Sequence, residues 1–179
     1  MNLYVMRSAV QADGLRDMIR ATDLWGTPFC MAEIGSFAGE SAEIFLEEGA
    51  GVLCAVDLWA PIAYRENVAE NIRPDLAEEE FDRRTRRPIW RVVKFKMSSQ
   101  EAANLIPDGY LDLFYIDAEH TFDAVTRDIV AWLPKLRAGG WASGHDWSWP
   151  GVGDAVRKFL GHFGEPRIFQ DDSWLVQVQ

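Results

Sequence analysis

Short apolar runs and helical patterns alternate along most of this chain. Apolar runs at residues 29–34, 52–56, 111–116 and 141–143 predict buried strands, and the partly alternating residues 90–95 predict another strand. Apolar positions with helical spacing predict helices at residues 11–25, 40–48, 78–87, 99–105, 122–136 and 152–163. Residues 167–169 and 173–178 predict a final antiparallel strand pair. This order predicts an α/β fold, with a mainly parallel sheet and helices on both faces.

We expect a single domain over residues 1–179. This length supports one sizeable core and is short for two ordinary domains. No internal repeat, low-complexity tract or linker interrupts the pattern. We interpret residues 1–27 as a helical lead-in to the sheet and residues 58–90 as a candidate lid or acceptor region.

Polar residues stand at the ends of four predicted strands: Glu33, Asp57, Asp117 and the pair His145 and Asp146. Ligands of such sheets bind outside the carboxyl ends of the parallel strands. Gly35 and Gly39 form a turn between the first strand and its helix. Glycines let a ligand approach the backbone, and the acid after the second strand can accept hydrogen bonds from two ribose hydroxyls. The layout therefore predicts a nucleoside cofactor in a doubly wound, Rossmann-like sheet.

The glycine loop departs from the loops that bind phosphate. Its pattern is Glu33-x-Gly35-x-x-x-Gly39, whereas dinucleotide-binding loops have Gly-x-Gly-x-x-Gly and P-loops have Gly-Lys-Ser/Thr. An acid in the loop would repel a phosphate. It suits a cationic ligand that carries an amino group and a sulfonium.

Three motifs carry a resemblance to a known family. They are Glu33-Ile-Gly-Ser-Phe-Ala-Gly39, Ile116-Asp117-Ala-Glu-His120, and Gly139-Gly-Trp-Ala-Ser-Gly-His145-Asp146. In this order and spacing the chain resembles class I S-adenosylmethionine-dependent methyltransferases, over roughly residues 29–163. The motif combination is similar to a small bacterial subgroup that includes sugar and natural-product O-methyltransferases.

The resemblance implies cofactor-binding roles for Glu33, Gly35, Ser36, Gly39, Asp57, Leu58, Trp59, Ser98, Ser99, Asp117 and His120. The loop from Glu33 to Gly39 would hold the methionine end, and Asp57 the ribose. Leu58 and Trp59 would pack on the adenine, and Ser98 and Ser99 would contact its edge. Asp117 and His120 would line the cofactor and acceptor side of the cleft. Each residue also has a structural alternative: turn glycines, a capping Asp57, a core Trp59, or a His120 that only starts the next helix.

An oxygen acceptor must lose its proton during methyl transfer, and a base or a bound metal can assist. Similar metal-dependent enzymes hold Mg²⁺ with acids at positions that Asp117 and Asp146 match. His145 departs from the oxygen ligands that Mg²⁺ prefers. Three alternatives stay open: a metal on Asp117 and Asp146, a catalytic base at His145 oriented by either acid, or a structural role for the pair. Trp147 and Trp149 follow, and an exposed indole there could stack on an acceptor.

The net charge of the chain narrows the classes of partner that it can bind. The formal net charge is −10 and the pI is about 4.7, which argues against nucleic acid. The basic stretch 83–87 adjoins the acidic run 78–80, and we expect these side chains to pair on a solvated helix face. No apolar run is long enough to span a bilayer, and the amino terminus lacks a signal-peptide pattern. We therefore expect a cytoplasmic protein that acts on a small molecule, with a homo-oligomer completing a short acceptor pocket.

Two other functions compete with this interpretation. A nicotinamide-dependent oxidoreductase would require a three-glycine loop and a Tyr-x-x-x-Lys pair, and the sequence has neither. A non-catalytic nucleoside-binding or assembly module with the same fold would bind the cofactor without turnover, or would not bind it.

Overall fold

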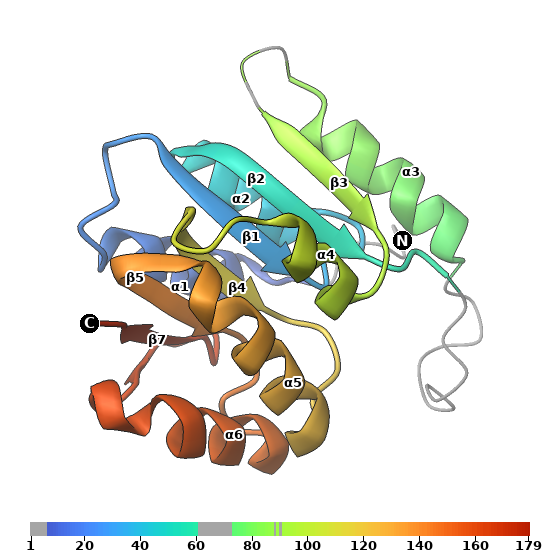
Figure 1. Ribbon diagram of the computed structural model, residues 1–179. Coiled ribbons are helices and arrows are strands. Elements are labelled where there is room, and N and C mark those ends of the chain that lie inside the picture. Colours follow the sequence, from blue (N-terminus) through green and yellow to red (C-terminus); the bar gives the residue numbers. More distant parts are fainter. Residues whose placement is uncertain (1–6, 61–72, 88, 90) are drawn as a thin grey trace.

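The computed structural model describes residues 7–60, 73–87, 89 and 91–179. These residues form one sheet with the strand order β3-β2-β1-β4-β5-β7-β6 (Figure 1). The strands are β1 (Phe29–Ile34), β2 (Ala50–Asp57), β3 (Val92–Lys96), β4 (Leu111–Ile116), β5 (Leu136–Gly144), β6 (Arg167–Ile168) and β7 (Trp174–Gln177). Strands β1 to β5 are parallel, and β7 runs antiparallel to both β5 and β6. The predicted α/β sheet with a C-terminal antiparallel pair is confirmed.

Helices cover both faces of the sheet (Figure 1). The helices are α1 (Ala9–Arg20), α2 (Glu40–Glu47), α3 (Pro74–Thr85), α4 (Ser99–Leu105), α5 (Phe122–Trp132) and α6 (Pro150–Leu160), and short 3₁₀ turns follow α5 and α6. Buried side chains of α1, α2 and α3 share one core cluster with the sheet, and those of α4, α5 and α6 share another. The two cores lie on opposite faces of the sheet. Packing on both faces holds the strands, and therefore the residues at their ends, in position.

The first helix differs from its predicted bounds at both ends. It starts at Ala9, because Ser8 and Gln11 form a capping box: each side chain accepts a hydrogen bond from the other residue's backbone N–H. It ends at Arg20 rather than at residue 25. There the Thr22 hydroxyl donates to the carbonyl of Ile19 and accepts the N–H of Leu24, which turns the chain. The apolar periodicity continued into this turn and carried the prediction too far.

Proline positions explain two further shifts of helix bounds. α3 starts at Pro74 and α6 starts at Pro150, both ahead of the predicted starts. Proline suits the first helical turn, whose N–H groups have no intrahelical partner. The predicted region 58–90 and the strand start at residue 90 lie partly outside the described residues, as does the start of the lead-in at residues 1–27.

The two glycines before residue 141 lie inside a strand. The predicted strand began only at residue 141, but β5 begins at Leu136 and runs through both glycines. Gly139 adopts a φ of +75°, and the pairing of β4 with β5 shifts register between Leu111 and Leu113. The glycines thus form an irregularity within β5 instead of ending a loop.

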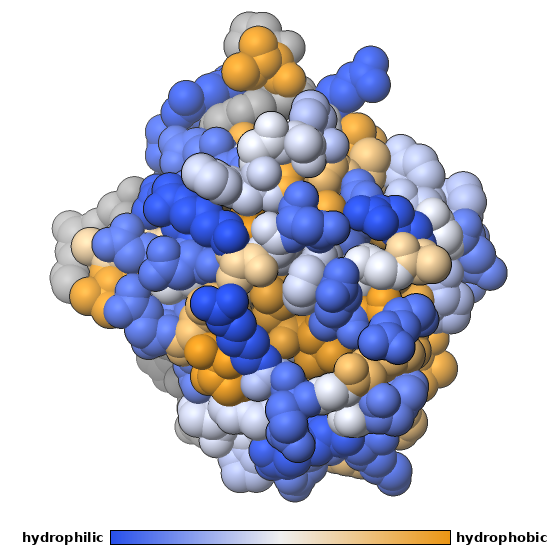
Figure 2. All heavy atoms as spheres, turned by 90° about the vertical axis from the view of Figure 1, so that its left-hand side faces the viewer, coloured by the Kyte–Doolittle hydropathy of each residue, from blue (hydrophilic) through white to orange (hydrophobic). Residues whose placement is uncertain are grey.

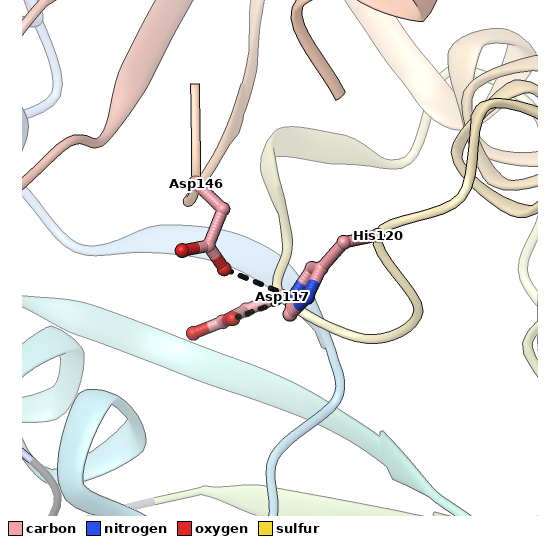
Figure 3. Close-up of side chains that lie close together, drawn as sticks. All are labelled: Asp117, His120 and Asp146. Carbon is pink, nitrogen blue, oxygen red and sulfur yellow. Dashed lines mark ion pairs between the residues drawn. The ribbon is translucent and has the colours of Figure 1, made fainter. Parts of the chain in front are cut away.

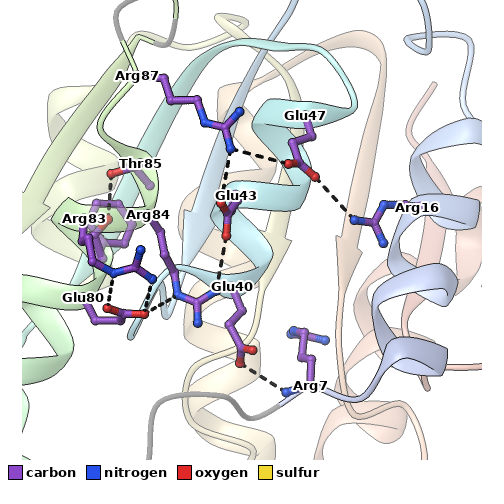
Figure 4. A network of polar contacts seen from close by, with 11 residues as sticks. Arg7, Arg16, Glu40, Glu43, Glu47, Glu80, Arg83, Arg84, Thr85 and Arg87 are labelled. Atoms are coloured by element: carbon purple, nitrogen blue, oxygen red, sulfur yellow. Dashed lines mark hydrogen bonds and ion pairs between the residues drawn. The ribbon is translucent and has the colours of Figure 1, made fainter. Parts of the chain in front are cut away.

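Ion pairs connect α3 to α2 (Figure 4). Within α3, Glu80 pairs with Arg83 at 2.6 Å and with Arg84 at 3.0 Å, which is the predicted pairing, but the side chains of Glu80 and Arg84 are largely buried and only Arg83 is solvated. Arg84 also reaches Glu43 of α2 at 3.3 Å, and Arg87 lies 3.7 Å from the same carboxylate. The basic stretch is therefore matched by acids of its own helix and of the neighbouring one.

The end of the sheet at which β1 to β5 begin faces the viewer in Figure 2. Hydrophilic side chains surround an apolar area on this face. The predicted site residues lie at the opposite end, where these strands finish. Among the described residues, no helix has the length and apolar character needed to cross a membrane.

Candidate active site

Three side chains meet where β4 and β5 end (Figure 3). Asp117 follows β4, His120 lies three residues further on, and Asp146 follows β5. Nε2 of His120 is 2.9 Å from Oδ2 of Asp146 and 3.8 Å from Oδ1 of Asp117. One ligand atom from each residue lies within 4.8 Å of the others. The structure thus brings together the two predicted acids, with His120 between them.

His145 lies on the other side of Asp146. Its Nδ1 is 3.2 Å from Oδ1 of Asp146, and its Nε2 is buried without a hydrogen-bond partner in the described part of the chain. Asp146 holds this position with a φ of +58°, a left-handed conformation that Asp adopts more readily than most residues. One carboxylate therefore separates two imidazoles.

Electrostatic interactions within the cluster determine the protonation states of His120, His145 and Asp146. The carboxylates of Asp117 and Asp146 raise the pKa of His120 to about 9. Burial lowers the pKa of His145, but the contact with Asp146 and the charge of Asp117 together outweigh it and the net shift is upward. Burial opposes ionisation of Asp146, yet the two imidazoles hold its pKa well below its usual range. Asp146 is therefore a carboxylate at neutral pH, positioned to orient either imidazole.

The glycine loop is fastened to the end of β2. Asp57 accepts the N–H of Phe37 at 2.9 Å on one oxygen and the N–H of Trp59 at 2.7 Å on the other. Gly35 has a φ of +95°, and a Cβ there would lie 2.2 Å from the carbonyl oxygen of Asp117. A glycine at 35 is thus needed for packing against the end of β4. Each oxygen of Asp57 retains a lone pair for a further donor.

Glu33 lies near the end of β1 and is fully buried. Neither of its carboxylate oxygens has a hydrogen-bond partner among the described residues. Burial raises its pKa to about 7; the hydroxyls of Ser41 and Ser36 oppose the shift but fall short of hydrogen-bond geometry. Unpaired buried carboxylates are costly, so a partner for Glu33 is expected from outside the described protein groups.

The residues predicted to contact the adenine are engaged with the protein itself. The Ser98 hydroxyl caps α4 and donates to the Glu101 carboxylate at 2.6 Å. Ser99 Oγ accepts the indole N–H of Trp132 at 2.9 Å. Their adenine contacts stay predictions.

Trp59 and Leu58 lie in different environments. Trp59 is buried, and its ring centroid is 5.2 Å from that of Phe81 in α3. Its indole N–H donates to the carbonyl of Phe37 at 2.7 Å. Trp59 therefore lies in the core, which was the structural alternative to its predicted packing on the adenine. Leu58 is exposed and remains available to pack on a ligand.

Trp149 extends the site outward. It is 55% exposed, and its ring centroid lies 5.3 Å from that of His120. Trp147 instead packs beneath the guanidinium of Arg157, 4.9 Å from the ring centroid. Of the two indoles after the cluster, Trp149 is therefore the one placed to contact an acceptor.

A family model described as "Methyltransferase domain" matches residues 32–147, about two thirds of the chain. The chain belongs to this methyltransferase family. The match spans the glycine loop, Asp57 and the whole Asp117–Asp146 cluster, and it confirms the resemblance found in the sequence. No curated protein sequence matches the chain.

Solved methyltransferases share its fold. The O-methyltransferase NovP has a TM-score of 0.72 and 16% identity, covering 99% of this chain and 83% of its own. An O-methyltransferase from Bacillus cereus, solved with S-adenosylhomocysteine, has a TM-score of 0.62 and 14% identity over 97% and 82% of the two chains. CalS11, a TDP-rhamnose 3′-O-methyltransferase of calicheamicin biosynthesis, has a TM-score of 0.61 and 15% identity over 93% and 77%. At these identities the likeness shows the class I methyltransferase fold.

The group formed by Asp117, His120 and Asp146 would suit some metal ions better than others. Two carboxylates and an imidazole are a poor match for Mg²⁺, which prefers oxygen ligands in octahedral geometry. The same set suits Mn²⁺, Fe²⁺, Co²⁺ or Zn²⁺. The structure thus adds the imidazole of His120, and not that of His145, to the group formed by the two acids predicted as Mg²⁺ ligands; metal binding there stays a prediction.

Two site residues were missed or misjudged from the sequence. His120 was assigned to ligand contact only, although its spacing from Asp117 within one motif could have suggested a joint cluster. Arg7 was not considered, yet its Nη2 donates to Asp117 at 2.6 Å. Nothing in the sequence links a residue before the first helix to the end of β4.

Proposed function

We propose that this methyltransferase uses S-adenosylmethionine to methylate a hydroxyl group of a small molecule. The observation that carries the proposal is the meeting of Asp117, His120 and Asp146, with His145 behind, at the strand ends beside the glycine loop. Acids and imidazoles in a partly buried cluster are groups that can take a proton from an alcohol or phenol. Bound S-adenosylmethionine supplies the methyl group on a sulfonium.

The residues around the glycine loop support binding of that cofactor. Asp57 retains lone pairs for the ribose hydroxyls after fastening the loop through Phe37 and Trp59. The unpartnered carboxylate of Glu33 suits the cationic methionine end, directly or through water. Gly35 keeps the loop close to the end of β4. The exposed side chain of Leu58 follows Asp57 and is placed to pack on the adenine.

The base mechanism assigns proton transfer to His145. Nδ1 of His145 faces Asp146, and its unpartnered Nε2 is the atom that accepts the proton of the acceptor hydroxyl. Asp146 orients the imidazole and stabilises its positive charge once it is protonated. The acceptor oxygen then forms its bond to the methyl carbon as the bond from carbon to sulfur breaks. Alignment of the two reactants accounts for much of the rate.

A metal mechanism is the second candidate, and the Asp117–His120–Asp146 group favours it. A divalent transition metal on these residues would lower the pKa of a coordinated acceptor hydroxyl. His120 separates the two mechanisms, because it would be a ligand in one and only a neighbour of Asp146 in the other.

The acceptor class follows from the exposed indole and from the fold. Trp149 offers an apolar face beside His120, which suits an aromatic ring or the apolar face of a sugar. CalS11, of the same fold, acts on a sugar hydroxyl. We propose a sugar or natural-product hydroxyl as the acceptor, and a second copy of the chain as the element that completes the acceptor pocket.

Calorimetric titration with S-adenosylmethionine and S-adenosylhomocysteine tests the cofactor. We expect micromolar binding by the wild type and at least about tenfold weaker binding by Asp57→Ala, since charge-assisted hydrogen bonds to the ribose are lost. Asp108→Ala, an exposed acid paired with Lys135, is the matched control and should bind normally. A folded wild type that binds neither ligand contradicts the proposal and supports a non-catalytic module.

The mechanism is tested with a panel of sugar and phenolic acceptors. Turnover that survives a chelator supports the base mechanism. Turnover that is lost and then restored by Mn²⁺ or Co²⁺, with His120→Ala unable to be restored, supports the metal. Sedimentation of the active form shows whether it is a dimer or larger assembly.

A further inference from the structure

Arg7 brings a guanidinium to the place where three structural elements meet. Its Nη2 donates to Asp117 at the end of β4 at a distance of 2.6 Å. Its backbone N–H donates to Glu40 at the start of α2 at 3.2 Å (Figure 4). Its side chain is only 11% exposed. Arg7 thus connects the residues just before α1 to the start of α2 and to the end of β4.

Two charged groups in this small region lack partners among the described residues. Nη1 of Arg7 is buried and has no acceptor within hydrogen-bond geometry, although the Tyr115 hydroxyl lies near enough to help raise the pKa of Arg7; both oxygens of Glu33 are buried and accept from no donor. The two side chains are close enough for each to shift the other's pKa. A buried guanidinium with an N–H that lacks an acceptor and a buried carboxyl with free oxygens therefore lie within electrostatic range of each other, unconnected by a hydrogen bond.

A ligand that is itself a zwitterion matches this arrangement. The methionine end of the cofactor carries an ammonium and a carboxylate on the same carbon. The ammonium suits Glu33, whereas the carboxylate would be repelled by Glu33, Glu40 and Asp117 unless a cation faces it. A guanidinium binds a carboxylate through directed, charge-assisted hydrogen bonds.

We propose that Arg7 binds the carboxylate of the cofactor's amino-acid end through Nη1, while Nη2 remains on Asp117. This inference rests on the proposed use of S-adenosylmethionine. Arg7 then selects ligands that carry a free carboxylate, and its contact with Asp117 joins cofactor binding to the Asp117–His120–Asp146 cluster.

The alternative role for Arg7 is purely structural, as an anchor that holds the start of α1 to the end of β4. The two roles make different predictions for a ligand without a carboxylate. An anchor supports the whole pocket, so its loss should weaken all adenosyl ligands alike. A carboxylate-binding residue matters only for ligands that have the carboxylate.

The test is a calorimetric cycle on the full chain with two probes: S-adenosylhomocysteine and its analogue that lacks only the carboxylate. Wild type, Arg7→Ala and Arg7→Lys are compared, with Arg20→Ala as the matched control. Arg20 also pairs with a carboxylate, Glu48 at 2.8 Å, but it stands exposed at the opposite end of α1. Thermal melts establish that each variant is folded.

We expect Arg7→Ala to weaken S-adenosylhomocysteine by roughly tenfold to a hundredfold, and to change the affinity for the analogue by less than about twofold. Arg7→Lys should retain part of the affinity, because it keeps the charge without the planar fork. Arg20→Ala should leave both ligands unaffected.

Equal weakening of both ligands by Arg7→Ala overturns the inference and leaves Arg7 as an anchor. If Arg7→Ala does not fold, the inference is tested with the wild type alone. Binding of the analogue at least about tenfold more weakly than S-adenosylhomocysteine supports the inference, and equal binding of the two ligands overturns it. A wild type that binds neither ligand contradicts the proposed function itself, which distinguishes the two failures.

Discussion

Nδ1 of His145 lies 3.2 Å from Oδ1 of Asp146, and Nε2 of the same ring has no hydrogen-bond partner among the residues that the structure describes. If this imidazole is the base, His145→Gln should lower kcat by about 10²–10⁴-fold. The affinity for S-adenosylhomocysteine should stay unchanged. Single-turnover kinetics with the best acceptor, alongside calorimetry, measure the two effects.

His162→Gln is the control for that experiment, because this exposed histidine lies beyond α6 and away from the cluster. It should have wild-type kinetics. A His145→Gln enzyme that keeps its kcat would rule out the base mechanism and leave proton removal to the metal mechanism.

Trp149 should contribute to acceptor binding and little to cofactor binding. Trp149→Ala should raise the acceptor KM by roughly fivefold to tenfold through loss of stacking, with kcat changed less. Trp25→Ala removes an indole of nearly equal exposure, 57% against 55%, from the loop before β1. Steady-state kinetics in which both variants raise KM equally would show that Trp149 has no specific contact with the acceptor.

The buried carboxyl of Glu33 should make stability depend on pH. Its pKa is raised from 4.5 to about 7 in the folded state, so the folded protein binds the proton more tightly than the unfolded chain. Stability is therefore greatest below pH 4.5 for this group and falls as pH rises to 7, by about 3 kcal/mol in total.

Glu33→Gln removes that titration, so the stability of the variant relative to the wild type should increase as pH rises. The difference in Tm between variant and wild type should shift in the variant's favour by roughly 5–10 °C from pH 4.5 to pH 8, measured by calorimetric melts. Glu79→Gln, at an exposed position of α3, should show no such shift. A pH-independent difference for Glu33→Gln would mean that the carboxyl is ionised at a normal pKa.

Gly35 and Gly26 have similar positive φ angles, +95° and +85°, but different surroundings. Gly26→Ala should cost about 1 kcal/mol from backbone strain alone, since no atom lies within 4 Å of the new Cβ. Gly35→Ala adds a collision with the Asp117 carbonyl and should cost about 3 kcal/mol or more. Denaturant unfolding measures both. Equal costs would show that the end of β4 can move away from the loop.

The sequence predicted β1 and β4 well, because each is a mostly apolar run between polar residues. The bounds of β1 and β4 match, and so do those of α4, where a serine cap marks the start. Errors arose where local chemistry overrides periodicity. Thr22 turns the chain out of α1 while apolar residues continue, and Gly139 adopts a positive φ, which glycine tolerates, without ending β5.

The site was predictable only in part, for a similar reason. Adjacent parallel strands have to bring Asp117 and Asp146 together, so topology alone predicts their meeting. Asp146, which contacts both imidazoles, has a left-handed backbone that sequence patterns do not encode. Arg7 reaches the cluster through a tertiary contact 110 positions away in the sequence.

Both outer strands of the sheet are poor templates for another chain. β6 offers only the two residues Arg167–Ile168, too short a ladder for a foreign strand to extend. β3, at the other border, carries Lys94 and Lys96, whose ammonium groups pair with Glu78 of α3. Short edges and edge lysines both disfavour strand addition. The protein can therefore keep a seven-stranded sheet in a small chain with little tendency to polymerise into fibres.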